Sequence, residues 1–141
     1  MKFHFLSSNN PEAKDTEKKL TESFGQYSVE DADYIIPIGG DGLLLKSLHN
    51  FNKLNKPFFG INFGSIGFLM NNLSNENLND MIVNAKKSTF KPLKMTAQSV
   101  NNEIFEAYAY NEVSLMRQTH LASKIKIKIN EKVKMEELIF L

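Results

Sequence analysis

Residues 34–42 spell YIIPIGGDG, an apolar segment that runs directly into a glycine-rich turn. Residues 34–38 predict a buried strand, and residues 43–51 after the turn have helical character. A second short apolar strand, 57–61, leads into the sequence NFGSIGFL at 62–69. Strand, loop and helix in alternation predict a parallel α/β sheet.

The flanking segments extend this pattern. Residues 2–6 predict an opening strand, followed by turn residues and a polar helix over 11–24, which Pro11 can begin and Gly25 can end. Ser74 is a candidate cap for a later helix. The apolar face of that helix would hold Leu78, Met81, Ile82 and Ala85.

From Phe90 onward the sequence favours strands. Segments 93–100 and 104–115 flank Asn101-Asn102, a plausible hairpin turn. We therefore expect a Rossmann-like parallel α/β domain with the GGDG loop over residues 1–90, followed by the beginning of an antiparallel β domain over 91–141.

Isoleucine and lysine alternate over residues 124–129, which predicts a strand with one buried and one solvated face. Asn130-Glu131 can turn this strand back into residues 132–135. The sequence ends on the apolar residues 139–141, in mid-pattern, so we expect a truncated β region whose edges need further sheet or another chain.

Composition narrows the class of protein. The 141 residues are 42% hydrophobic and 23% charged, with a net charge of +1, which is typical of a globular protein and predicts neither a nucleic-acid nor a membrane partner. The chain has no cysteine, so disulfides and thiolate zinc sites are excluded. No apolar run approaches the roughly 20 residues of a membrane helix. We expect a soluble, cytoplasmic protein.

The turn Gly39-Gly40-Asp41-Gly42 has the chemistry of a phosphate site. Glycines let the backbone approach a phosphate, and the following helix start adds partial positive charge. Asp41 could accept a proton from a hydroxyl nucleophile or help to hold a metal on phosphates. The alternative is a tight strand–helix turn in which the Asp41 carboxylate caps the helix.

Two further segments carry polar or glycine residues near strands. The 62–69 segment is a second glycine-bearing loop after a strand, although Phe68 alone could be a core aromatic. Tyr110-Asn111-Glu112-Val113 places two polar residues inside a predicted strand, so one of them should point inward and need a partner. A local hairpin hydrogen bond is the alternative.

Together, GGDG at 39–42, NFGSIGFL at 62–69 and YNEV at 110–113 resemble the bacterial NAD kinase family. The resemblance implies transfer of a phosphoryl group from ATP or polyphosphate to the 2′-hydroxyl of the adenosine ribose of NAD, giving NADP. It also implies Mg²⁺ or another divalent cation and a homo-oligomer, either a dimer or a tetramer.

The resemblance also implies residue roles. Asp41 matches the proton acceptor, and with Gly42 it matches the NAD-contacting pair. Lys46 matches a basic position near the nucleotide, Phe68 an aromatic that packs on adenine, and Asn111 with Glu112 a pair that hydrogen-bonds NAD. The full expected binding set is Gly39, Gly40, Asp41, Gly42, Lys46, Asn62, Gly64, Phe68, Asn111 and Glu112. The three histidines are scattered, so we predict no protein metal site.

The sequence departs from the family in two respects. Leu43 follows the glycine turn where many members have threonine, and a glycine- and threonine-rich motif of the family's second half is missing. A catalytically incomplete nucleotide-binding module is therefore an alternative. A lipid kinase with a GGDG loop is a further alternative, which Tyr110-Asn111-Glu112 disfavours.

Overall fold

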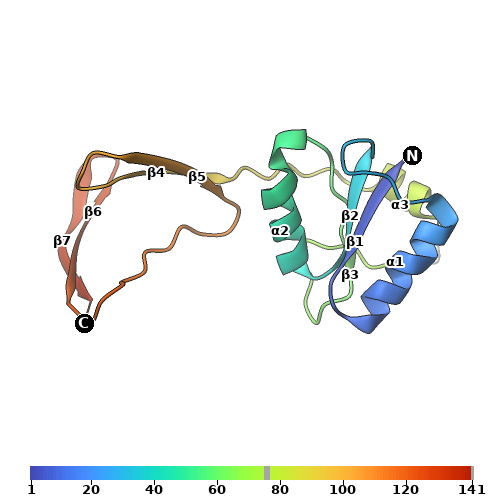
Figure 1. Ribbon diagram of the computed structural model, residues 1–141, viewed down its shortest axis with the longest axis horizontal. Helices are drawn as coiled ribbons and strands as arrows, with labels where there is room; N and C mark the ends of the chain where they lie inside the picture. Colours follow the sequence, from blue (N-terminus) through green and yellow to red (C-terminus); the bar gives the residue numbers. More distant parts are fainter. Residues whose placement is uncertain (75–76, 141) are drawn as a thin grey trace.

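A computed structural model describes residues 1–74 and 77–140, with the backbone alone described for Phe140. Figure 1 shows the helices and a parallel sheet in one lobe and antiparallel strand pairs in another. The elements are β1 (Phe3–Ser7), α1 (Pro11–Phe24), β2 (Tyr34–Gly39), α2 (Asp41–Phe51), the 3-10 turn η1 (Asn52–Leu54), β3 (Ile61–Asn62), α3 (Leu78–Asn84), β4 (Leu93–Gln98), β5 (Ile104–Ala109), β6 (Ser123–Ile129) and β7 (Lys132–Phe140).

The parallel sheet has the order β1-β2-β3, which confirms the predicted fold class. β1 and β2 pair in parallel from Phe3–Tyr34 through to Ser7–Ile38. The predicted strand over 57–61 is shorter than expected. Its pairing with β2 is limited to one isolated bridge between Phe58 and Ile35 and to the two residues of β3.

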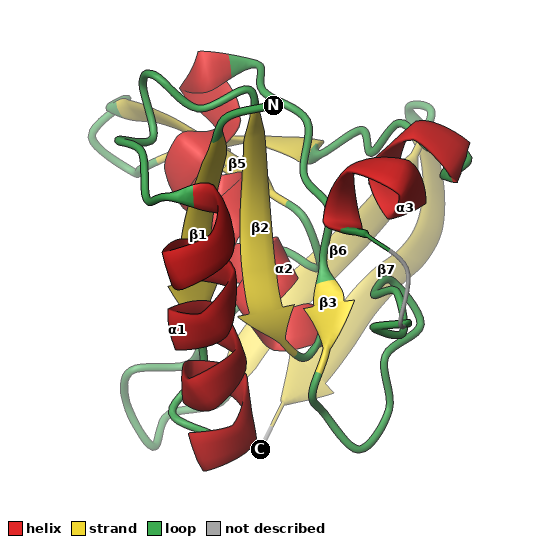
Figure 2. Cartoon of the chain, turned by 90° about the vertical axis from the view of Figure 1, so that its right-hand side faces the viewer, coloured by secondary structure: helices red, strands yellow, loops and turns green. Residues whose placement is uncertain are grey.

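Helices cover both faces of this sheet, with α1 and α3 in front and α2 behind in Figure 2. Alternate strand residues face opposite sides, so the buried Phe3, Phe5, Ile36, Ile38 and Ile61 share one face and form the core with α1 and α3. Ile35 and Pro37 face the other way, and α2 contributes the buried Leu44 and Ser47. A ring contact of 6.1 Å between His4 and Phe51 also joins β1 to α2.

Helix boundaries follow local capping chemistry. α1 begins at Pro11, as predicted, and the side chain of Asn10 accepts from the N–H of Glu12. It ends at Gly25, whose φ of 77° suits glycine. The prediction that Ser74 caps α3 is wrong, because Asn77 performs this role. Ala85 is exposed just beyond the helix rather than on its apolar face.

The antiparallel region contains two hairpins. β4 pairs with β5 around the predicted Asn101-Asn102 turn, where Asn102 has a φ of 63°. β6 pairs with β7 around the predicted Asn130-Glu131 turn, in which both residues have positive φ. β5 ends at Ala109, not at Leu115, so the prediction of a strand over 104–115 is wrong in its second half.

The β4–β5 hairpin has two chemically different faces. On β4–β5 the cross-strand register places one face in apolar residues only, namely Leu93, Met95, Ala97, Phe105, Ala107 and Ala109. The opposite face carries the ion pair between Lys94 and Glu106 at 2.7 Å. On β6–β7, Lys124 pairs with Glu137 and Lys126 with Glu136, whereas Lys128 lies opposite Val133 in the strand register. Within the described ranges, no helix is both long and apolar enough to cross a bilayer.

The buried face of β2 should dominate the stability of the α/β lobe. Ile38 is fully buried between the helices and the sheet, so Ile38→Ala should lower the free energy of unfolding by about 2–5 kcal/mol. Ile66, 67% exposed, is the control, and Ile66→Ala should change it by less than about 0.5 kcal/mol. Urea denaturation followed by far-UV circular dichroism measures both. Equal effects of the two changes would contradict this account of the core.

Candidate functional site

Three loops meet where the parallel strands end. The N–H of Ser8, just after β1, donates to the carbonyl of Ile38 at 3.0 Å. The N–H of Phe63, after β3, donates to the carbonyl of Gly39 at 2.7 Å. The side-chain amide of Asn10 donates to the carbonyl of Phe63 at 3.1 Å. These hydrogen bonds make one continuous edge from three segments far apart in the sequence.

For the first of these loops, which follows β1, the sequence predicted only a turn. Asn10 caps α1 and also donates to the loop after β3. Only the cap could be predicted from the sequence, from the position of Asn10 directly before Pro11. Its tertiary contact has no signal in the sequence, because the partner lies 53 residues away.

The two glycine loops touch through their backbones. A Cβ atom on Gly64 would lie 3.2 Å from the Cα of Gly40, so a side chain there would press on the facing loop. A Cβ on Gly39 would lie 3.0 Å from the side chain of Leu43 and 3.1 Å from that of Ser8. A Cβ on Gly42 would meet nothing within 4 Å. A side chain at 39 or 64 would thus make a tight contact that its neighbours must yield to, whereas Gly42 borders open space.

Residues 62–71 form a loop whose two ends are joined, here called the 62–71 loop. The N–H of Asn62 donates to the carbonyl of Asn71, and the N–H of Asn71 donates to the carbonyl of Gly60, both at 2.8 Å. Inside the loop, the side-chain oxygen of Asn62 accepts from the N–H of Gly64 at 3.0 Å. A Cβ on Gly67 would come within 2.6 Å of this Asn62 side chain. The loop is therefore folded around Asn62.

Asp41 connects the two loops through its carboxylate. One oxygen accepts from the N–H of Phe68 and the other from the N–H of Leu69, each at 3.0 Å. The alternative in which Asp41 caps the helix is wrong, because Gly40 is the N-cap of α2 and no side chain caps it. Asp41 thus lies in the first turn of α2 and faces the 62–71 loop.

Phe68 presents an aromatic ring to solvent. Its side chain is 88% exposed although its backbone is held by Asp41, so the alternative of Phe68 as a core aromatic is wrong. Lys46 lies on the same helix as Asp41 and is exposed. The structure therefore brings Asp41, Phe68, Asn62 and the glycines of both loops to one edge of the sheet.

Asn111 and Glu112 belong to a different part of the molecule. Both are exposed and follow the end of β5, so the prediction that one of them points inward from a strand is wrong. Ala109 pairs with Leu93, the first residue of β4, and the described ladder does not continue to residues 110–115. Among the residues described, no hydrogen bond or ion pair links either side chain to the glycine loops.

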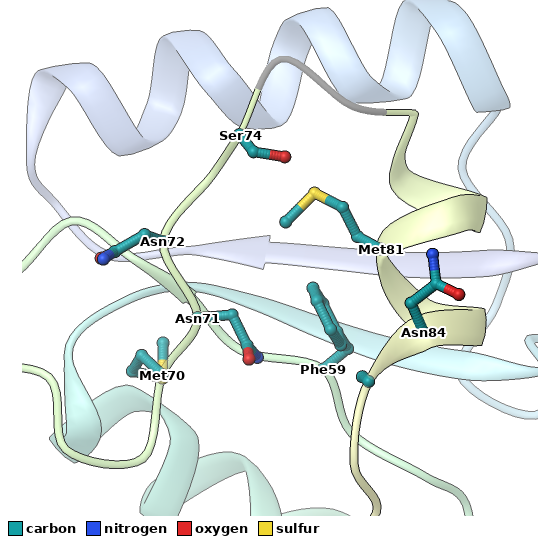
Figure 3. A pocket seen from close by; sticks show the side chains of 8 residues that line it. Phe59, Met70, Asn71, Asn72, Ser74, Met81 and Asn84 are labelled. Carbon is teal, nitrogen blue, oxygen red and sulfur yellow. The ribbon is translucent and has the colours of Figure 1, made fainter.

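A pocket of about 440 Å³ lies beside the base of the 62–71 loop, against α3 (Figure 3). Amide, hydroxyl and apolar side chains line it: Phe59, Met70, Asn71, Asn72, Ser74, Met81, Asn84 and Ala85. None of the residues predicted from the sequence to bind a ligand is among them. The pocket shares Met70 and Asn71 with the 62–71 loop but contains none of the predicted ligand-binding residues.

The fold and this edge define an α/β domain with glycine turns at the carboxyl ends of parallel strands, where ligands of such sheets bind. A sequence profile of the ATP-NAD kinase N-terminal domain matches residues 1–82. The chain belongs to this family.

Curated relatives agree with the match. The chain is 44% identical to an NAD kinase of Brucella suis biovar 1 over 136 residues, covering 96% of this chain and 53% of the relative. It is 37% identical to an NAD kinase of Hyphomonas neptunium over 139 residues, 99% of this chain and 54% of the relative. An NAD kinase of Rickettsia bellii is 39% identical over 138 residues, 98% of this chain and 54% of the relative. The chain thus spans about half the length of the curated relatives it matches.

The surroundings of the glycines lead to opposite predictions at two positions. Gly67→Ala should destabilise the chain by about 1 kcal/mol or more, because the new methyl group would displace the Asn62 side chain. Gly42→Ala is the matched control. It lies in the first turn of α2 with no positive φ and open space beside it, so stability should hold or rise by a few tenths of a kcal/mol. Thermal denaturation distinguishes them, and a stable Gly67→Ala chain would contradict the role of Asn62.

Proposed function

We propose that this chain is part of an NAD kinase, in which a phosphoryl group passes from ATP to the 2′-hydroxyl of the adenosine ribose of NAD. The observation that carries the proposal is the direct link between the Asp41 carboxylate and the backbone of the exposed Phe68. Asp41 would accept the proton of the ribose hydroxyl, and the exposed Phe68 ring would pack on the base of the same nucleoside. The family of the chain supports the same assignment.

In the proposed reaction Asp41 orients the attacking hydroxyl. A carboxylate offers about four acceptor positions, and two of them are occupied by N–H groups, so the others remain for a hydroxyl. The ribose oxygen forms a bond to the terminal phosphorus of ATP while the bond from that phosphorus to the bridging oxygen breaks. ADP leaves with the electron pair, and the hydroxyl proton passes to Asp41. Positioning and electrostatics supply most of the catalysis, as is usual for phosphoryl transfer.

The glycine turn is proposed to face the phosphates. Gly42 borders open space, which allows a ligand to approach the backbone closely, and Gly40 is the N-cap of α2. The partial positive charge of the helix start favours an anion there. Lys46, one turn further along α2 and exposed, would add a full positive charge near the nucleotide.

The proposal includes a divalent cation only because the family resemblance implies one. Within the described part of the chain, no three His, Asp or Glu side chains gather where they could hold a metal. Mg²⁺ commonly reaches phosphoryl-transfer sites bound to substrate phosphates, with few protein ligands, and we propose this for the present chain. ATP is the proposed donor, with polyphosphate as the alternative.

Residues 91–141 are proposed to form part of a second, β-rich domain next to the α/β domain of residues 1–90. Asn111 and Glu112 remain predicted NAD ligands, and both are exposed and thus free to meet a nucleotide. The cytoplasmic location remains a prediction from the sequence.

The role of Asp41 can be tested by replacing its charge. In an NADP-formation assay, Asp41→Asn should lower turnover about 10²-fold or more, the usual size of a general-base effect. Affinity for NAD, measured by isothermal titration, should fall much less. Asp33→Asn serves as the control. The Asp33 carboxylate, just before β2, also accepts a backbone N–H, that of Lys2. Equal losses of turnover and affinity would instead make Asp41 a binding or folding residue.

The same two measurements address the alternative function. The alternative is a nucleotide-binding module of the same family, and the chain spans about half the length of its curated relatives. NAD binding without NADP formation would support the module. Absence of NAD binding would contradict both candidates.

Self-association is the proposed mode of assembly. The apolar face of β4–β5 carries large exposed side chains, including Leu93 at 54% and Phe105 at 56%. Both two-stranded sheets also have free edges that invite pairing with another strand. A second copy of the chain could cover both features, which favours a homo-oligomer.

Light scattering on paired variants tests this assembly. Phe105→Lys places a charge in the apolar face and should shift the chain toward monomer. Tyr108→Lys, on the opposite face of the same strand, should leave the oligomer intact. A monodisperse wild-type monomer, or equal behaviour of the two variants, would contradict assembly through this face.

A further inference from the structure

We propose that Asp41 is also a positioning residue, whose ionised carboxylate holds the 62–71 loop in the conformation that presents Phe68. The clamp itself is independent of the proposed function, whereas the ligand that packs on Phe68 rests on it. The clamp comprises the two Asp41 oxygens and the N–H groups of Phe68 and Leu69.

The two ends of the clamp differ in how firmly they are held. Asp41 begins α2, which is anchored in the core by the buried Leu44 and Ser47. The Phe68 ring is 88% exposed, so packing of its own side chain contributes little to holding the loop at that point. The loop ends are joined at Asn62 and Asn71. The backbone orientation at residue 68 therefore depends on its hydrogen bond to Asp41.

The chemistry of the clamp requires a carboxylate. Two consecutive N–H groups face one side chain, and an ionised carboxylate is the group that accepts on both oxygens without donating. Hydrogen bonds to a charged acceptor are roughly twice as strong as those between neutral groups. In Asp41→Asn one oxygen would be replaced by an amide that donates, so one N–H would lose its acceptor and face another donor.

The clamp links two parts of one ligand. The proposed proton acceptor for a ribose hydroxyl also sets the position of the aromatic proposed to pack on the base of the same nucleoside. The structure thus couples recognition of a purine ring to the placement of the reacting hydroxyl. A nucleoside that cannot place its ribose hydroxyl at Asp41 and its base on Phe68 at the same time would bind more weakly.

Amide hydrogen exchange without nucleotide tests the clamp directly. In the wild-type chain the amides of Phe68 and Leu69 should be protected. Asp41→Asn should speed their exchange about tenfold or more, while the amides of Ile36 and Ile38 in the core strand stay protected. Asp33→Asn, which removes the carboxylate that accepts from the N–H of Lys2, should leave both loop amides unchanged. Unchanged protection in Asp41→Asn would overturn the clamp, and general loss of protection would make Asp41 a folding residue.

Coupling to ligand binding is tested by a double-mutant cycle on NAD affinity with Asp41→Asn, Phe68→Ala and the double variant. Asp41→Asn raises the Kd for NAD by some factor in the wild type and by another factor in the Phe68→Ala background. If Asp41 positions Phe68, the second factor should be at least threefold smaller than the first. Independent effects of the two changes would overturn the positioning role. If the wild-type chain does not bind NAD, the proposed function fails, while the exchange measurement still decides the clamp.

Discussion

Two neighbouring N–H groups, those of Phe68 and Leu69, donate to the carboxylate of a residue 27 and 28 positions earlier in the chain. This contact fastens the loop after β3 to the helix after β2. The close approach of Gly64 to Gly40 accompanies it, since a Cβ at Gly64 would lie only 3.2 Å from the Cα of Gly40. These contacts hold the backbone beneath the Phe68 ring, which is itself 88% exposed.

The edge is built chiefly from backbone groups and amides. The N–H of Phe63 donates to the carbonyl of Gly39, and the side-chain amide of Asn10 donates to the carbonyl of Phe63, which joins neighbouring loops. Within the 62–71 loop, the side chain of Asn62 accepts from the N–H of Gly64. Beneath it, the apolar core of β1, β2 and β3 fixes where the strands end. The Asp41 carboxylate and the exposed Phe68 ring are the groups that this edge offers to the proposed ligand.

The antiparallel hairpins follow a different logic. The register of β4–β5 separates an apolar face from a polar one, yet its large apolar side chains Leu93 and Phe105 remain largely exposed. In the α/β lobe the equivalent apolar faces are covered by helices. The exposed face explains why a further partner surface belongs to the proposal for this region. The polar pair Asn111 and Glu112 lies exposed beyond the end of β5.

The sequence by itself determined the parallel sheet, the start of α1 at Pro11 and the hairpin turns at 101–102 and 130–131, because these depend on local periodicity and backbone chemistry. It also marked both glycine loops. Local pattern placed the α3 cap at Ser74 and extended β5 to Leu115, and both were wrong, since capping and strand length depend on which groups find partners. Only the tertiary structure decided that Asp41 holds the 62–71 loop instead of capping α2. A carboxylate can accept from any suitable N–H in reach, and which N–H is in reach depends on how distant segments pack.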